Sequence, residues 1–211
     1  FDSKRQIEAK VFASGFKLEA RVKKCQDTQL ARTKNKAEVF TPSWLVNQMN
    51  NYHDQDWFFK KEVFNREREK SWGPIYRKVE FENPDDWKNY VQEKVLEITC
   101  GEAPFLVSRY DASTGEEIKP TIMRMGILDR KLRLVNENTE TKEDWISWAI
   151  KAVQASYGYE YQGDSLLIAR INILMTFVEY FEERWNQPVD MATILKLANI
   201  ISWNIWQMDG L

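Results

Sequence analysis

The sequence predicts an α/β protein built around a parallel β-sheet. Short apolar runs typical of strands alternate along the chain with longer segments of helical periodicity, in the order strand, helix, strand, helix, strand. This alternation is typical of parallel sheets, because parallel strands need crossover connections that are usually helices. Ligands of such sheets bind beyond the carboxyl ends of the strands, so residues at those ends are the first candidates for a site.

Composition excludes several classes of protein. The chain has 211 residues, of which 43% are hydrophobic, enough for a sizeable core. The two cysteines, Cys25 and Cys100, and the single histidine, His53, cannot build a disulfide framework or a Cys/His zinc site, which indicates a reducing, cytoplasmic setting. The most apolar stretch, residues 166–178, is shorter than the roughly 20 residues of a membrane span. We therefore expect no membrane partner and no metal.

Charge is distributed unevenly. The net charge is -2, but residues 1–36 contain ten Lys or Arg and four Asp or Glu. Such a segment is most simply a solvated helical arm, and the alternative is that it contacts DNA phosphates.

The first third of the chain is predicted to be mainly helical. Mixed apolar spacing indicates a helix through about residue 27. Thr41 can cap a helix whose first position is Pro42 and which runs to about Asn50. The apolar residues in 51–82 show no clear helical or strand periodicity, and this stretch is expected to be helix and loop.

The middle of the chain carries the first predicted strand. Residues 83–86 (Asn-Pro-Asp-Asp) have the signature of a helix start. Residues 95–98 form an apolar run that predicts a strand, followed by a tight turn at 99–104 and a helix from Phe105. Residues 111–138 are polar and turn-rich, which is typical of an insertion.

The last third predicts two helices between strands. A capping-box pattern at Thr141 starts a helix that precedes a strand at residues 157–161. The strongest amphipathic pattern covers residues 164–185. A further helix over 191–197 and a third strand over 200–206 complete the series.

The aromatic residues are interpreted first as packing groups. Trp57, Phe58, Phe59, Trp145 and Trp148 are expected to lie in the core or at an interface rather than to stack on bases.

Three groups that could hold a nucleoside lie at strand carboxyl ends: the turn at 97–103, Glu160 and Asp209. A nucleoside needs small residues where the backbone approaches it, a carboxylate for the ribose hydroxyls and a polar group for the adenine edge. Each group also has an ordinary interpretation. The glycine of the first group can simply form a turn, Glu160 can be a carboxylate that happens to end a strand, and Asp209 can belong to an Asp-Gly turn. The pattern alone does not identify the nucleotide.

Four stretches resemble, in order, the motifs of amino-group DNA methyltransferases. Residues 38–42 (Glu-Val-Phe-Thr-Pro) resemble motif X, and residues 95–106 (Val-Leu-Glu-Ile-Thr-Cys-Gly-Glu-Ala-Pro-Phe-Leu) resemble motif I. Residues 157–160 (Tyr-Gly-Tyr-Glu) are similar to motif II, and residues 207–211 (Gln-Met-Asp-Gly-Leu) to motif III. Motif X before motif I is the order of the gamma class, which methylates the N6 of adenine in restriction-modification systems. The position of motif X disfavours an RNA or protein methyltransferase.

The resemblance implies a binding site for S-adenosyl-L-methionine. Its residues would be Phe40, Thr41, Pro42, Glu97, Thr99, Gly101, Ala103, Phe105, Glu160, Tyr161 and Asp209. Thr41 and Pro42 would border the methionine moiety, the turn would wrap the cofactor, Glu160 would hold the ribose and Asp209 would meet the adenine amino group.

Three positions depart from the family pattern. Ala37 stands where motif X often has glycine, and Ile98 and Ala103 depart from motif I. The substitution at Ala103 affects the closest backbone approach to the cofactor.

The resemblance also implies a fold and its division. We expect an incomplete Rossmann-like class I S-adenosylmethionine-dependent methyltransferase fold, its sheet truncated at the C-terminus. A helical N-terminal region at 1–93 would contain motif X, and a partial cofactor-binding domain at 94–211 would carry an insertion near 111–140.

The family's Asn-Pro-Pro-Tyr type of tetrapeptide, which binds the flipped adenine, does not occur in the sequence. No catalytic residue is therefore expected here, and the parent protein is expected to continue beyond Leu211 with catalytic and target-recognition regions. Double-stranded DNA would bind through the full-length enzyme, while this part alone would be inactive. The alternative is a non-catalytic DNA-binding or scaffold module that retains the fold.

Overall fold

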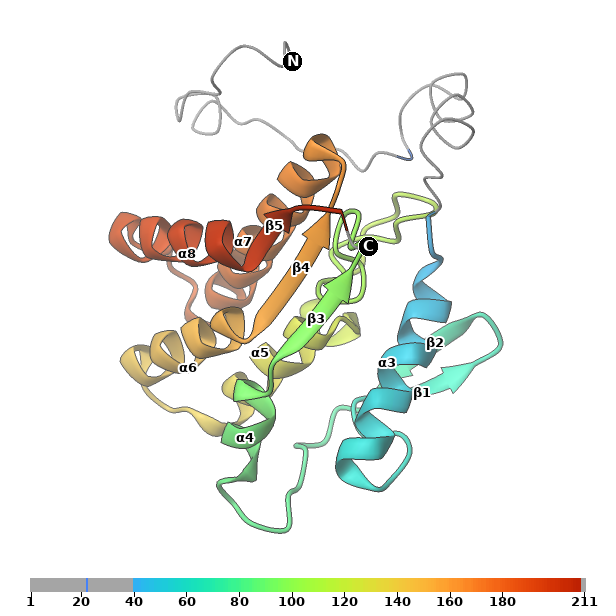
Figure 1. Ribbon diagram of the computed structural model, residues 1–211. Coiled ribbons are helices and arrows are strands. Elements are labelled where there is room, and N and C mark those ends of the chain that lie inside the picture. The colour runs from blue at the N-terminus through green and yellow to red at the C-terminus, as the bar shows by residue number, and fades with distance from the viewer. Residues whose placement is uncertain (1–21, 23–39, 210–211) are drawn as a thin grey trace.

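The structure is a computed structural model that describes residue 22 and residues 40–209. Six α-helices and two β-sheets form in this part of the chain (Figure 1). The predicted α/β class with a parallel sheet is confirmed. Apart from residue 22, the predicted helix at 1–27, the basic segment 1–36 and residues 37–39 of the motif X stretch lie outside the described residues. Within residues 40–209, none of the helices combines the length and apolar character that a membrane span requires.

The parallel sheet has three strands in the order β3, β4, β5. β3 spans Val95–Ile98, β4 spans Ser156–Glu160 and β5 spans Ile205–Gln207. The strands are adjacent in sequence order, so all three carboxyl ends meet at one edge of the sheet (Figure 1). The predicted first and second strands are confirmed.

Helices α6 (Lys142–Gln154), α7 (Gly163–Trp185) and α8 (Met191–Asn204) lie together on one side of the sheet (Figure 1). The Thr141 side chain accepts a hydrogen bond from Asp144 N, so the capping prediction is confirmed. α7 is confirmed within one residue.

The third strand was predicted too long. Residues 200–204 continue α8, because Ile201 falls four residues after Leu197 and both side chains are buried on the same face of the helix. Only residues 205–207 pair with β4.

The residues expected to be a polar insertion contain a core helix, α5 (Ile127–Asn138). Leu128, Leu132 and Val135 are completely buried. The helix was missed because Arg130 and Lys131 lie between these residues and are buried too.

The helix predicted from Phe105 was wrong. Residues 105–107 lie instead against the start of α5, where the carbonyl oxygens of Phe105 and Leu106 accept hydrogen bonds from Ile127 N and Leu128 N. Gly126 makes this approach possible, since a Cβ there would lie 2.4 Å from Leu106 O.

The N-terminal part contains α3 (Ser43–Phe58), a hairpin of β1 (Asn65–Arg68) and β2 (Ser71–Pro74), and α4 (Asp86–Gln92). α4 begins at Asp86, two residues after the predicted first position Pro84, and its N-cap is Asp85 rather than Asn83. Pro42 is the N-cap of α3 rather than its first residue, and Thr41 does not cap it. The hairpin was not predicted.

A buried ion pair joins α3 to α5. Arg130 Nη1 bonds Asp54 Oδ2, and both side chains are almost completely buried. Tyr90 Oη donates to Asp54 Oδ1 at 2.6 Å, and Arg130 Nη2 reaches Asn51 Oδ1 at 2.7 Å. Because buried charges need partners, this network fixes how α3 lies on the rest of the fold.

One face of the parallel sheet is largely uncovered within the described residues. Leu96 and Ile98 of β3 point to this face, and Ile98 is 57% exposed. Tyr159 lies beside Ile98 in register, and Trp206 lies beside Tyr159 on the next strand. Parallel sheets usually have both faces covered, so this apolar face is unusual.

Removing one member of the buried pair should destabilise the fold strongly. Asp54→Ala leaves Arg130 buried without its counter-ion, so we expect the free energy of unfolding in urea to fall by about 3–5 kcal/mol. Glu117→Ala breaks the exposed Glu117–Lys119 pair and should cost no more than about 1 kcal/mol. Equal losses in the two variants would contradict the assigned role of the Arg130–Asp54 pair.

Candidate functional site

A cleft of about 600 Å³ lies between α3 and the carboxyl end of β3. Most of its lining comes from three distant stretches of the chain, and two further residues, Ala112 and Ile127, complete it. The lining residues are Phe40, Thr41, Met49, Asn50 and His53; Val95 to Glu102, Pro104, Phe105 and Leu106; Ala112 and Ile127; and Glu160, Gln162 and Ser165. The size is within the range of small-molecule sites, roughly 300–1,000 Å³.

The turn after β3 has an unusual backbone. Thr99, Gly101 and Ala103 have φ values of 54°, 55° and 62°. This region is disfavoured for residues with a Cβ, and most of all for a β-branched residue such as Thr99. Backbone strain of this kind collects at functional sites, where surrounding contacts hold it in place.

Glu160 at the end of β4 holds this turn in position. Its carboxylate accepts hydrogen bonds from Gly101 N and from Gln162 N, both at 2.7 Å. The turn can pass this close to β4 because Gly158 has no side chain; a Cβ there would lie 3.0 Å from Cys100 Sγ. The ends of β3 and β4 therefore form one unit around a carboxylate.

Glu97 is a second carboxylate in the lining. Its two oxygens accept from Leu106 N at 3.1 Å and Phe105 N at 3.4 Å. Burial raises the pKa of Glu97 to about 8, with a further contribution from Glu160, although the two backbone bonds oppose the increase. A cation entering the cleft would favour the ionised form of Glu97.

α3 forms the opposite wall and is bonded to the loop after β3. Ser43 N, at the first turn of α3, donates to Asp111 Oδ2 at 2.8 Å. Asn50 Nδ2 donates to the carbonyl oxygens of Phe105 and Met125, at 3.0 and 2.9 Å. The two walls are therefore held at a fixed separation by direct bonds.

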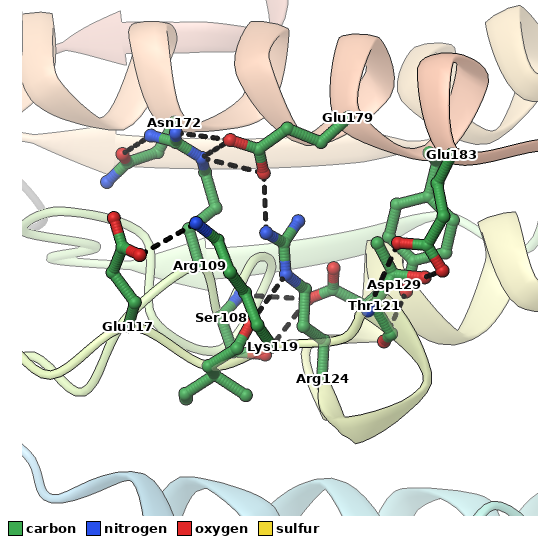
Figure 2. Close-up of polar contacts among 12 residues, drawn as sticks. Ser108, Arg109, Glu117, Lys119, Thr121, Arg124, Asp129, Asn172, Glu179 and Glu183 are labelled. Atoms are coloured by element: carbon green, nitrogen blue, oxygen red, sulfur yellow. Dashed lines mark hydrogen bonds and ion pairs between the residues drawn. The ribbon is translucent and has the colours of Figure 1, made fainter. Parts of the chain in front are cut away.

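The same loop is anchored to α5 and α7 by the polar network in Figure 2. The carboxylate of Glu179 forms ion pairs with two arginines of the loop. Its Oε1 lies 2.5 Å from Arg109 Nη2, and its Oε2 lies 2.5 Å from Arg124 Nη2. Burial alone would raise the pKa of Glu179, but the hydrogen bonds and charges of the two arginines outweigh it and hold the pKa below its ordinary value. Glu179 therefore stays ionised and clamps two points of the loop.

Other bonds in the network fix the remaining turns of the loop (Figure 2). Ser108 donates from N and Oγ to Asp129 Oδ2, at 2.8 and 3.0 Å, and Thr121 Oγ1 donates to Glu183 at 2.9 Å. The loop lacks regular structure over most of its length, yet four of its residues, at positions 108, 109, 121 and 124, are bonded to helices of the core.

The structure brings most of the predicted site residues together. The cleft is lined by Phe40, Thr41, Glu97, Thr99, Gly101, Phe105 and Glu160. Four others do not line it: Pro42 caps α3, the Ala103 side chain is buried beneath the turn, Tyr161 is 63% exposed, and Asp209 is exposed after β5.

Sequence reasoning missed part of the α3 wall. Asn50 and His53 line the cleft one helical turn apart, together with Met49. The helix was predicted to stop at Asn50, so His53 was not placed on the same face. Extending the three- and four-residue spacing from Val46 would have found it.

Comparisons with protein-family models, with curated proteins and with solved structures find no match for this chain. Function is therefore inferred from the residues and geometry of the cleft.

The raised pKa of Glu97 predicts how stability depends on pH. In the folded state the Glu97 carboxyl group keeps its proton up to about pH 8, whereas its ordinary pKa is 4.5. Glu97 therefore contributes most to stability at low pH. Each pKa unit of difference corresponds to about 1.4 kcal/mol. The stability of the wild type relative to Glu97→Gln should fall as pH rises from about 4.5 to 8.

Urea unfolding of both proteins at several pH values across that window measures the effect. The glutamine that replaces Glu97 does not titrate, so the difference between the two free energies isolates the carboxyl group of Glu97. A difference that is constant with pH, or that grows in favour of the wild type, would contradict the assignment.

Proposed function

We propose that this chain is the S-adenosyl-L-methionine-binding part of a DNA adenine-N6 methyltransferase of a restriction-modification system. One observation carries the proposal: three of the four stretches that resemble methyltransferase motifs line the same cleft, although they are about 60 residues apart in sequence. The parallel order β3, β4, β5 is compatible with an incomplete Rossmann-like class I methyltransferase fold.

The chemistry of the cleft suits the proposed cofactor. Glu160 lies at a strand carboxyl end, where a carboxylate accepts hydrogen bonds from ribose hydroxyls. Glu97 can ionise next to the cationic methionine end of the cofactor, bordered by Phe40 and Thr41. Leu96 and Ile98 offer apolar surface. The cofactor supplies an activated methyl group, and the protein's part is to orient it.

The proposed role of Asp209 depends on motif order alone. It would meet the adenine amino group, but it lies outside the lining of the cleft. Pro42, Ala103 and Tyr161 would act by shaping the backbone around the cofactor rather than by direct side-chain contact.

The uncovered sheet face supports the proposal that this chain is one part of a larger methyltransferase. Leu96 and Ile98, which also line the cleft, belong to this face, and the face continues across the sheet to Trp206, which is exposed and lies outside the cleft lining. We propose that the catalytic and target-recognition regions of the enzyme cover this face, and that double-stranded DNA is methylated only when they do.

Cofactor binding tests the proposal directly. Isothermal titration calorimetry with S-adenosyl-L-methionine should detect binding to the wild type, and Glu160→Gln should weaken it by roughly tenfold or more, because a charged acceptor is replaced by a neutral one. Glu182→Gln, an exposed α7 position, is the matched control and should bind normally.

If calorimetry detects no heat of binding at millimolar S-adenosyl-L-methionine, the proposal is wrong. It would favour a scaffold module that keeps the fold without the cofactor. Equal affinity of the wild type and Glu160→Gln would remove Glu160 from the site.

Cofactor affinity should also depend on pH through Glu97. A cationic ligand favours the ionised carboxylate, so binding releases a proton and affinity should rise between about pH 6 and pH 8. In Glu97→Gln the dependence should be lost. Titrations in buffers of different ionisation enthalpy would show the proton release, and its absence would place the cationic end of the cofactor elsewhere.

A further inference from the structure

The exposed positive charge of the described chain is concentrated on the β1–β2 hairpin and its flanks. Residues 59–78 contain seven Lys or Arg and three Glu, whereas the rest of residues 40–209 contains 13 Lys or Arg and 24 Asp or Glu. All seven cations of residues 59–78 are exposed. Elsewhere in residues 40–209 only Lys94, Lys119 and Lys196 reach that exposure. The hairpin is thus a basic region on an acidic body.

Strand alternation separates the charges of the hairpin. Glu67 faces α3, where Asn51 Nδ2 donates to it at 2.7 Å. Arg66 and Arg68, on either side of Glu67 in β1, therefore point to the opposite face. Their partners in β2 are Gly73 and Ser71, so this outward face carries two arginines above two small residues. Lys70 follows at the turn.

The hairpin is held rigidly from behind. The guanidinium of Arg133, on α5, donates to Phe64 O at 3.0 Å before β1 and to Ile75 O at 2.6 Å after β2. Trp72 Nε1 donates to Met123 O at 2.7 Å. Both ends and the inner face of the hairpin are fixed, so binding on its outer face loses little conformational entropy.

Two exposed aromatic residues flank the hairpin in the sequence. Phe59 is 93% exposed and Tyr76 is 78% exposed. Phe59 is therefore not a core residue, which leaves only the interface part of its prediction, whereas Trp145 is completely buried as expected. Cations with interspersed aromatic rings are typical of surfaces that bind nucleic acids.

We propose that the outward face of the hairpin, centred on Arg66, Arg68 and Lys70, binds the phosphate backbone of double-stranded DNA. The hairpin lies on the side of α3 away from β3, so DNA bound there leaves the cleft free (Figure 1). A two-stranded ribbon fits the major groove of B-DNA, about 12 Å wide, with arginines reaching the phosphates on its borders. Glu62 lies beside the basic face and pairs with Arg66 at 3.5 Å, an exposed ion pair that a phosphate group can displace. The choice of duplex DNA rests on the proposed function.

Anisotropy of a fluorescent 20-base-pair duplex, measured with the full chain over a series of salt concentrations, tests the proposal. The triple variant Arg66→Gln/Arg68→Gln/Lys70→Gln should bind roughly tenfold or more weakly, and the slope of log K against log salt should fall by about 2–3, as three phosphate contacts are lost. The matched control Lys94→Gln/Lys119→Gln/Lys196→Gln removes the same charge elsewhere and should change both quantities little.

Three results would overturn the proposal: no duplex binding by the wild type at low salt, equal weakening in both triple variants, or binding to phosphatidylserine vesicles in preference to duplex. The hairpin variant is also titrated with S-adenosyl-L-methionine. Normal cofactor binding with unchanged DNA affinity would reject only the hairpin surface. Hairpin-dependent DNA binding without cofactor binding would reject only the proposed methyltransferase site.

Discussion

The position of α3 against the sheet depends on one buried ionic contact, between Arg130 of α5 and Asp54 of α3. Neither charge has access to solvent, so each requires the other, and the pair admits few relative placements of the two helices. Tyr90, Asn47 and Asn51 complete the bonding. One wall of the cleft belongs to α3, and the hairpin rests on α3 from the other side. The cleft and the basic surface therefore both depend on this contact, in addition to the hydrogen bonds of Ser43 and Asn50 and the anchors of the hairpin.

The opposite wall depends on backbone geometry rather than on apolar packing. Three residues of the turn after β3 adopt left-handed conformations, and Glu160 accepts two backbone N–H groups that secure the turn to β4. A ligand approaching this turn would meet a preformed surface with two carboxylates, Glu97 and Glu160. Binding would require little rearrangement of the walls, because the loop beyond the turn is bonded to α5 and α7 through Asp129 and Glu179.

The sequence predicted those elements whose residues follow a simple periodic pattern. The strand at 95–98 is mostly apolar and the long helix at 164–185 repeats apolar residues every three or four positions, so both were found almost to the residue. α5 was missed because its buried Arg130 and Lys131 bind distant partners that no local pattern reveals. The hairpin was missed because alternating Arg and Glu in β1 lacks the apolar face by which strands are recognised.

The candidate site was predictable in part for the same reason. Residues that follow strands, such as Gly101 and Glu160, lie where parallel topology places them. The cleft also needs His53 and Asn50, which come from a helix outside the sheet, and their place depends on the Arg130–Asp54 contact. Asp209 follows a strand too, yet it lies outside the lining, since β5 is separated from β3 by β4.

The central claim is that three distant stretches of the chain form one cofactor cleft. Hydrogen exchange measured by mass spectrometry, with and without S-adenosyl-L-methionine, tests it most directly. The cofactor should slow exchange together in residues 43–53, 97–106 and 158–163, and leave α6 and the hairpin unchanged. Protection confined to one of these stretches, or located outside them, would contradict the claim.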